Sequence, residues 1–234
     1  MNVDLHHVFP GPSHATTLAE AYAEPLGAHD DRPWIWLCMV SSLDGSTVID
    51  GASGGLSSAN DSGVLLGLRT IADVILVGSG TVTGEGYGPP KKAGQRIGVV
   101  TGRGSVDTSS DLFTSGAGFV ITTEHATFDD GGVDVIRAGE SQVDLRSAIE
   151  QIPTVCPGAR FVQAEGGPTL NGALTDADLF DELNLTTSPA LVGGSGPRLV
   201  ERAEDHSHRF EMAQMVIDDE GFVFSRWRRR PTSP

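Results

Sequence analysis

The chain has 234 residues, and its 31 acidic residues outnumber the 16 basic ones, which gives a net charge of −15 at pH 7. This charge opposes non-specific binding to nucleic acid or to an anionic membrane, so a phosphorylated ligand needs hydrogen-bond donors placed locally. Two cysteines are too few for a disulfide framework. No signal peptide is visible and no apolar run approaches the roughly 18 residues of a membrane-spanning helix, which together indicate a cytoplasmic protein.

The first 32 residues are polar and contain scattered prolines and histidines, so we expect an irregular arm or a lead-in helix. Residues 33–234 carry no obvious linker and are expected to form a single domain. The continuous apolar run over 34–40 predicts a strand buried on both faces. A predicted helix over about 60–71, capped by Ser58 or Asn60, leads into a second buried strand at 74–77.

Short apolar runs continue this alternation of strands and helices. They predict strands at 97–100, 118–122, 133–136, 160–164 and 182–187, and helices over 143–152 and for about ten residues from Pro168. Residues 212–217 and 222–227 flank a turn and predict a terminal β-hairpin. We therefore expect an α/β fold with a mixed, mostly parallel sheet, helices on both faces and an antiparallel hairpin at one edge. The basic run Arg226, Arg228, Arg229 and Arg230 is interpreted as a solvated tail end.

Three loops that follow buried strands are candidates for chemistry, because ligands bind at the carboxyl ends of strands in open α/β sheets. In one, a strand runs through the glycine pair Gly166-Gly167 into a helix start at Pro168. Helix N-termini offer free N–H donors and glycine permits close approach, so this segment is either a phosphate site or a plain strand–helix turn.

The other two loops carry weaker patterns. Residues 78–90 are glycine-rich and suit a phosphate cradle or a lid, but they match neither the dinucleotide fingerprint nor the P-loop, so a mobile surface loop is an equal alternative. The third loop contains Asp44-Gly45, a turn pair. The chain lacks the zinc-deaminase and nucleophile-elbow motifs. His206 and His208 have no clear third ligand, so we expect a surface pair and no metal site.

Taken in order, these segments resemble the C-terminal reductase domain of the RibD family, which also occurs as the stand-alone pyrimidine reductase of riboflavin biosynthesis. The resemblance covers about residues 33–228. It rests on an ordered set of segments at 40–45, 68–82, 165–171, 179–183 and 189–194. It implies a dihydrofolate reductase-like fold.

The resemblance also implies NADPH as the cofactor. Gly166 and Gly167 would hold its pyrophosphate together with the helix that they open. Further cofactor contacts are implied at Gly80, Thr81, Val82, Pro168, Thr169 and Leu170. Thr101, Gly102 and Arg103 would read the 2′-phosphate, with Arg103 making a charge-assisted contact. Glu165 is either a ligand contact or a structural anchor.

The implied substrate is 5-amino-6-(5-phosphoribosylamino)uracil, whose ribosyl group is reduced to ribityl by hydride transfer to C1′. Ser42 and Asp44 would lie over the nicotinamide and the substrate, with Asp44 also a catalytic candidate. Many family members carry Asp-Asp-Pro where this chain has Glu85-Gly86-Tyr87. Glu85 is the candidate proton donor, with a solvent-facing glutamate as the alternative. Tyr87 is expected either to stack on the pyrimidine or to pack the loop.

Family members are commonly dimers, so a homodimer is expected, with no nucleic-acid or membrane partner. Two other functions stay open. The first is a reductase of dihydrofolate or another pterin, which the shared fold and the altered Glu85–Tyr87 segment allow. The second is an NADPH-binding protein without catalysis, which the same altered segment favours.

Overall fold

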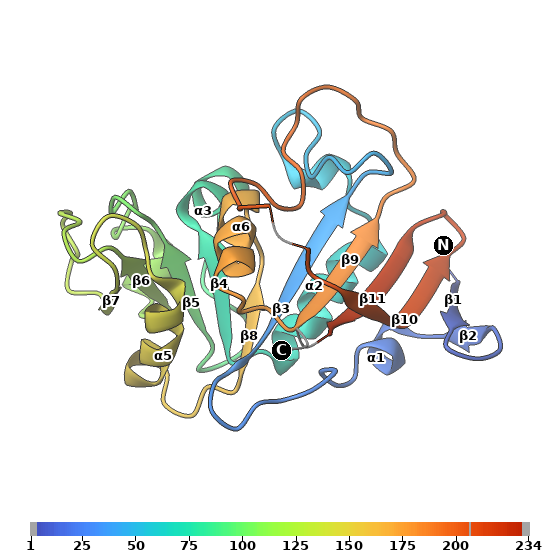
Figure 1. Ribbon diagram of the computed structural model, residues 1–234, viewed down its shortest axis with the longest axis horizontal. Coiled ribbons are helices and arrows are strands. Elements are labelled where there is room, and N and C mark those ends of the chain that lie inside the picture. The colour runs from blue at the N-terminus through green and yellow to red at the C-terminus, as the bar shows by residue number, and fades with distance from the viewer. Residues whose placement is uncertain (1–3, 206, 231–234) are drawn as a thin grey trace.

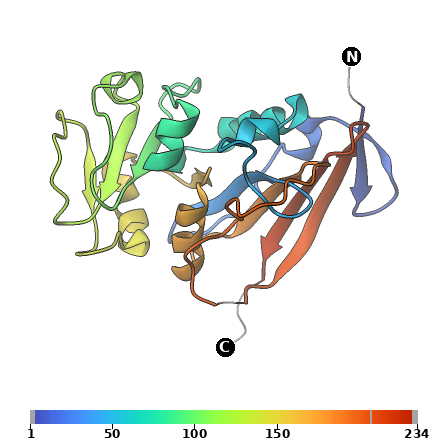
Figure 2. The same cartoon turned by 90° about the horizontal axis from the view of Figure 1, so that it is seen from above.

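The computed structural model describes residues 4–205 and 207–230, which build one 11-stranded sheet with helices on both faces (Figures 1 and 2). The strand order is β2-β1-β10-β11-β9-β3-β8-β4-β5-β6-β7. The strands are β1 Leu5–Phe9, β2 His14–Thr16, β3 Trp34–Ser41, β4 Val74–Gly78, β5 Arg96–Val100, β6 Gly118–Thr122, β7 Val135–Arg137, β8 Phe161–Ala164, β9 Glu182–Thr187, β10 Phe210–Asp218 and β11 Val223–Arg229.

The sheet is parallel from β9 to β7 and antiparallel from β2 to β9. The helices are α1 Leu18–Ala21, α2 Ala59–Ile71, α3 Ser79–Glu85, α4 Asp111–Thr114, α5 Leu145–Val155 and α6 Pro168–Asp176, with a 3-10 turn η1 at Ser53–Gly55. Figure 2 shows α5 and α6 on one face and α2 and α3 on the other. The predicted mixed sheet, the C-terminal hairpin and the helices on both faces are confirmed.

Local sequence explains the elements that hold the site. Strand β3 is apolar along almost its whole length because both of its faces are covered, and Ile35 and Leu37 are fully buried. Helix α2 starts at the N-cap Ser58, whose hydroxyl accepts a hydrogen bond from the Asp61 amide at 3.1 Å, and it buries Val64 and Leu68.

The N-terminal region differs from the irregular arm or helix that its composition predicts. Strand β1 pairs antiparallel with β10, and β2 pairs with β1, so residues 5–16 extend the sheet. The pattern is hidden because these strands lie at an edge and carry polar, half-exposed side chains such as His6 and His7. Tyr22 is buried in the same core cluster as Trp34 and Phe224.

The interpretation of the C-terminal arginines as a solvated tail end is wrong for Arg226, which is only 3 % exposed. Its Nη2 donates to Glu182 Oε1 at 2.8 Å, and its guanidinium also donates to the carbonyl oxygens of Ala21 and Glu24. Strand β11 lies between β10 and β9, so alternate side chains point into the protein. The buried Glu182 carboxylate compensates the charge that points inward.

Candidate active site

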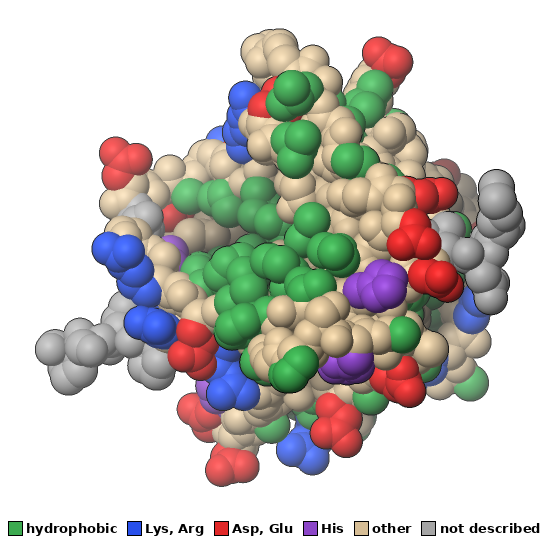
Figure 3. Space-filling model, turned by 90° about the vertical axis from the view of Figure 1, so that its right-hand side faces the viewer, with side chains coloured by type: hydrophobic (Ala, Val, Ile, Leu, Met, Phe, Trp, Pro, Cys, Tyr) green, Lys and Arg blue, Asp and Glu red, His purple; other side chains and the backbone are tan. Residues whose placement is uncertain are grey.

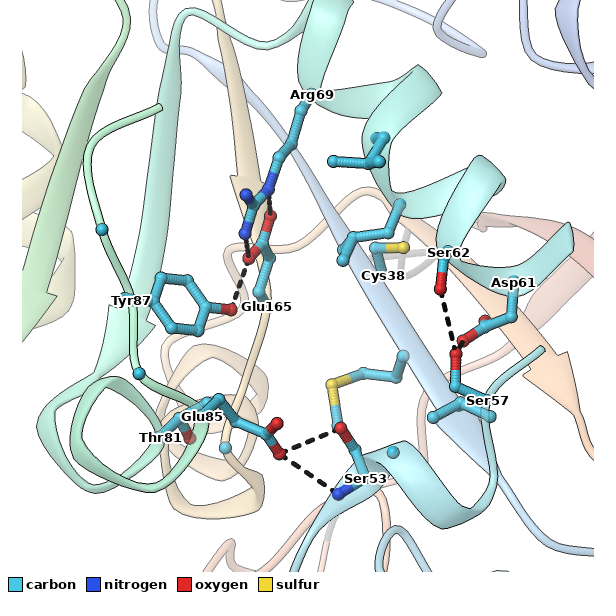
Figure 4. Close-up of a pocket in the computed structure, with 18 of the residues that line it drawn as sticks. Cys38, Ser53, Ser57, Asp61, Ser62, Arg69, Thr81, Glu85, Tyr87 and Glu165 are labelled. Carbon is cyan, nitrogen blue, oxygen red and sulfur yellow. Dashed lines mark hydrogen bonds and ion pairs between the residues drawn. The ribbon is translucent and has the colours of Figure 1, made fainter. Parts of the chain in front are cut away.

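A cavity of about 650 Å³ opens where the carboxyl ends of β3, β8 and β4 meet. Its lining comes from several elements far apart in sequence: β3, the loop over 47–57, helix α2, the segment 85–92, and the turn from β8 into α6. Figure 4 shows the polar side chains that face it. This is the position at which open parallel sheets bind ligands.

One wall of the cavity is a glycine-lined turn at the start of α6. The Gly167 N-cap has no side chain to cap the helix, so amide donors of the first turn are left free for a ligand. Gly78 ends β4 beside it and donates its amide hydrogen to the Gly166 carbonyl at 2.8 Å. A Cβ on Gly167 would lie 2.9 Å from Thr81 Oγ1. Free donors and a surface without side chains fit a pyrophosphate.

Glu165 sits beside this turn, and its side chain is only 2 % exposed. Arg69 binds it with two hydrogen bonds, Nε to Oε1 at 2.7 Å and Nη2 to Oε2 at 2.6 Å. Tyr87 donates its hydroxyl to Oε2 at 2.6 Å, and Gln163 donates its amide to Oε1 at 2.8 Å. Of the two roles expected for Glu165, this arrangement favours the structural anchor, since both oxygens are engaged.

Tyr87 takes part in this cluster and packs the loop that carries it. The Arg69 guanidinium lies 5.4 Å from the centre of the Tyr87 ring. Burial and the neighbouring Glu165 carboxylate raise the pKa of the Tyr87 hydroxyl well above its ordinary value. The sequence singled out Tyr87 and Glu165 but gave no role to Arg69 or Gln163. A charged side chain on a helix gives no sign of a partner 96 residues away.

Glu85 lies at the mouth of the cavity, at the end of α3. Its Oε1 accepts hydrogen bonds from the Ser53 amide at 3.1 Å and from the Ser53 hydroxyl at 2.9 Å. Figure 4 shows this contact spanning from α3 to the turn η1. Ser53 is a cavity residue that the sequence did not indicate.

Asp44 does not line the cavity. Its carboxylate accepts hydrogen bonds from the Ser42 hydroxyl at 2.5 Å, the Val192 amide at 3.1 Å and the Gly193 amide at 2.7 Å. These bonds, with Ser42 contributing most, hold the pKa of the Asp44 carboxyl well below its ordinary value. The carboxylate therefore braces the loop after β3 against the loop after β9.

The remaining predicted cofactor residues divide into two groups. Thr81, Gly167 and Pro168 line the cavity together with Glu165. Outside the cavity lining are Gly80, Val82, Gly166, Thr169, Leu170, Thr101, Gly102 and Arg103. The last three follow β5, the neighbour of β4, and so lie along the same edge of the sheet as Gly78. There Thr101 is buried while Gly102 and Arg103 are exposed.

The residues that the structure describes contain neither a cluster of metal ligands nor a helix that could cross a membrane. Among the residues that the structure describes, no group of three or more His, Cys, Asp and Glu side chains is placed to hold a metal ion. Of the predicted histidine pair, His206 lies outside the described residues. Within the described ranges, every helix is too short or too polar to span a bilayer.

Known proteins share both the sequence pattern and the fold. Residues 33–224 match the family described as the RibD C-terminal domain. A 2,5-diamino-6-ribosylamino-4(3H)-pyrimidinone 5′-phosphate reductase of Methanothermobacter thermautotrophicus is 26 % identical over 183 residues, which cover 71 % of this chain and 82 % of that protein. The protein of the same name from Archaeoglobus fulgidus is 24 % identical over 221 residues, or 85 % of this chain and 100 % of the relative.

Among solved structures, a pyrimidine reductase-like protein from Corynebacterium diphtheriae superposes with a TM-score of 0.80 at 24 % identity, covering 93 % of this chain and 100 % of the other. The riboflavin biosynthesis reductase Rib7 of Saccharomyces cerevisiae gives a TM-score of 0.69 at 21 % identity, covering 91 % and 97 %. The predicted dihydrofolate reductase-like fold is confirmed. By the match over residues 33–224, the chain belongs to the RibD C-terminal domain family.

Proposed function

We propose that the protein is an NADPH-dependent reductase that converts a 6-ribosylaminopyrimidine 5′-phosphate to its ribitylamino form. The observation that carries this proposal is the cavity that joins the uncapped, glycine-lined start of α6 to a polar wall from three other elements. A nicotinamide dinucleotide would enter along the glycines, and the pyrimidine would occupy the rest of the space. The names of the two archaeal relatives agree with this substrate class.

The pyrimidine itself has two candidates within this class. The sequence resemblance implies 5-amino-6-(5-phosphoribosylamino)uracil, whereas the archaeal relatives are named for the 2,5-diamino-4(3H)-pyrimidinone, which carries an amino group in place of the 2-oxo group. Both have the ribosylamine whose C1′ accepts the hydride. We propose the uracil as the substrate and include the diamino compound in the test.

The bound cofactor would supply the hydride, and the residues of the chain would bind and orient the reactants. Gly166, Gly167 and the first turn of α6 would bind the pyrophosphate. Arg103, exposed at the end of β5, would pair with the 2′-phosphate and favour NADPH over NADH. The loop over 42–57 would cover the reacting carbons and exclude water, which is the main contribution such a site makes to hydride transfer.

The test is the loss of NADPH absorbance when each pyrimidine is added to the purified protein, with parallel samples containing NADH or dihydrofolate. The proposal is supported if NADPH is oxidised with a ribosylaminopyrimidine phosphate and not with dihydrofolate, and if NADH is not oxidised in place of NADPH. Oxidation with dihydrofolate alone assigns the protein to the pterin reductases. Cofactor binding with no turnover in any sample leaves a cofactor-binding protein and refutes the proposal.

We also propose a homodimer formed through the open face of β9, β11 and β10. Pairing places Leu185 beside Ser225, which faces Met215, and Trp227 beside Met212, so these side chains share one face. Most of them are half-exposed, and in Figure 1 no helix lies on the side of these strands that faces the viewer, whereas α2 lies behind them. Figure 3, which views the molecule from the right-hand side of Figure 1, shows hydrophobic side chains gathered in a hollow.

A second copy suits this face because exposed apolar patches mark interaction sites and a two-fold dimer buries the same patch of both subunits. Sedimentation of the wild type at dimer mass and of Met215→Lys at monomer mass supports the assignment. A monomeric wild type at micromolar concentration refutes it.

A further inference from the structure

Residues 49–56, which we call the roof segment, contribute Ser53 and Gly54 to the cavity lining. The hydrogen bonds within the segment are local, such as the pair between Ile49 and Ala52. Its end is anchored by Leu56, which is fully buried. In the part of the chain that the structure describes, the hydrogen bonds to the roof segment from outside it come from the adjacent Ser57 amide and from the Glu85 carboxylate, so Glu85 is the one partner distant in sequence.

The chain on either side of the roof segment is braced more firmly. Before it, the Thr47 amide donates to the Pro197 carbonyl at 3.0 Å. After it, Ser57 donates its hydroxyl to the Asp61 carboxylate at 2.5 Å, and Ser58 caps α2. The roof segment is thus anchored at both ends, and the hydrogen bonds from Ser53 to Glu85 hold its middle.

The contact between Glu85 and Ser53 joins the roof segment to the side of the cavity proposed for the cofactor. Glu85 is the last residue of α3, and α3 begins beside Gly78 and the glycine turn proposed for the pyrophosphate. One oxygen, Oε1, accepts both hydrogen bonds from Ser53. Glu85 is exposed and Ser53 is partly exposed, so water competes for both bonds and the net stabilisation is small. Such a contact can open to admit a substrate and reform above it.

We propose that Glu85 is a positioning residue that acts through Ser53 to hold the roof segment closed over the bound pyrimidine, and that its carboxylate does not donate the proton. The effect on turnover rests on the proposed function, whereas the closure itself does not. This assignment replaces the proton-donor role expected for Glu85. It also gives Ser53, which the resemblance left without a role, a part in substrate binding.

Hydrogen exchange of the peptide over residues 46–58 tests the closure without any substrate. Glu85→Ala should speed exchange about fivefold, because the contact with Ser53 is lost. Glu85→Gln should exchange like wild type, because a single amide oxygen can accept both bonds. Ser53→Ala keeps the amide contact and loses the hydroxyl contact, so its exchange rate should lie between those of Glu85→Ala and Glu85→Gln. Glu150→Ala, an exposed change on α5, is the matched control and should have no effect.

Kinetics separate positioning from proton donation. Glu85→Ala should raise the KM for the pyrimidine about fivefold while the KM for NADPH stays within about twofold. Glu85→Gln should keep the kcat and the pH profile of the wild type, and Glu85→Ala combined with Ser53→Ala should be no worse than Glu85→Ala.

Two results overturn the proposal: unchanged exchange in Glu85→Ala, or a Glu85→Gln enzyme that loses kcat and one limb of the pH profile. If the wild type reduces no pyrimidine, the proposed function fails while the exchange experiment still decides the closure.

Discussion

Among single residues, Asp44 offers a charge whose effect can be followed with pH. Three hydrogen bonds lower its pKa below the ordinary value of 3.8, so the folded state favours the carboxylate. That contribution is present above pH 3.8 and is lost as the pH falls through the lower pKa of the folded state. The free energy of unfolding, measured with urea, should be higher for the wild type than for Asp44→Asn at neutral pH. The difference should shrink as the pH falls below 3.8. A difference independent of pH would contradict this account.

The Arg69–Glu165 pair gives a second prediction for single residues. Arg69→Met leaves a buried carboxylate without its cation and should lower the free energy of unfolding by about 3 kcal/mol. Adding Glu165→Gln removes the unpaired charge, so the double variant should lose less than Arg69→Met alone. Arg230→Ala breaks an exposed 3.9 Å contact with Glu211 and should cost under about 0.5 kcal/mol. Urea unfolding of the three variants makes the comparison.

Among the elements, the turn into α6 has little room for added volume on its cavity side. Gly167→Ala places a Cβ 2.9 Å from Thr81 Oγ1, on the surface proposed for the pyrophosphate. We expect the Kd for NADPH to rise about tenfold with little change in stability. Gly84→Ala in α3 meets nothing within 4 Å and is the control. Fluorescence titration measures both, and an unchanged Kd in Gly167→Ala would remove the turn from the binding site.

Sequence patterns predicted the central elements because of where these elements lie. The strands of the parallel half are covered on both faces, so they appear as apolar runs such as 74–77. The outermost strand β2 and its neighbour β1 are short and carry polar, partly exposed side chains in place of an apolar run, which is why both were missed. The glycine turn was predicted because Gly166 and Gly167 are adjacent in sequence. The cluster around Glu165 was not predicted, because Arg69 and Tyr87 reach Glu165 only through the packing of α2 and α3 against the sheet.

For the whole molecule, Arg226 links the N-terminal region to the sheet. Its guanidinium joins the Glu182 carboxylate to the carbonyl oxygens of Ala21 and Glu24. Arg226→Met leaves Glu182 buried without a cation and should cost about 3 kcal/mol of unfolding free energy. Limited proteolysis should then cut within residues 17–32 first. Cleavage at the same sites and rate as in the wild type would show that other contacts hold this region.

The closure of the N-terminal region onto the C-terminal hairpin has a consequence for biosynthesis. Arg226 binds the carbonyl oxygen of Ala21, 205 residues earlier, and β1 pairs with β10. On the ribosome, β1 therefore lacks its β10 partner, and the segment that carries Tyr22 lacks Arg226, until the C-terminal hairpin has left the exit tunnel. Nascent chains stalled before residue 210 would lack the hairpin side of the cluster around Tyr22, namely Val216, Phe222 and Phe224, and would expose apolar surface to chaperones.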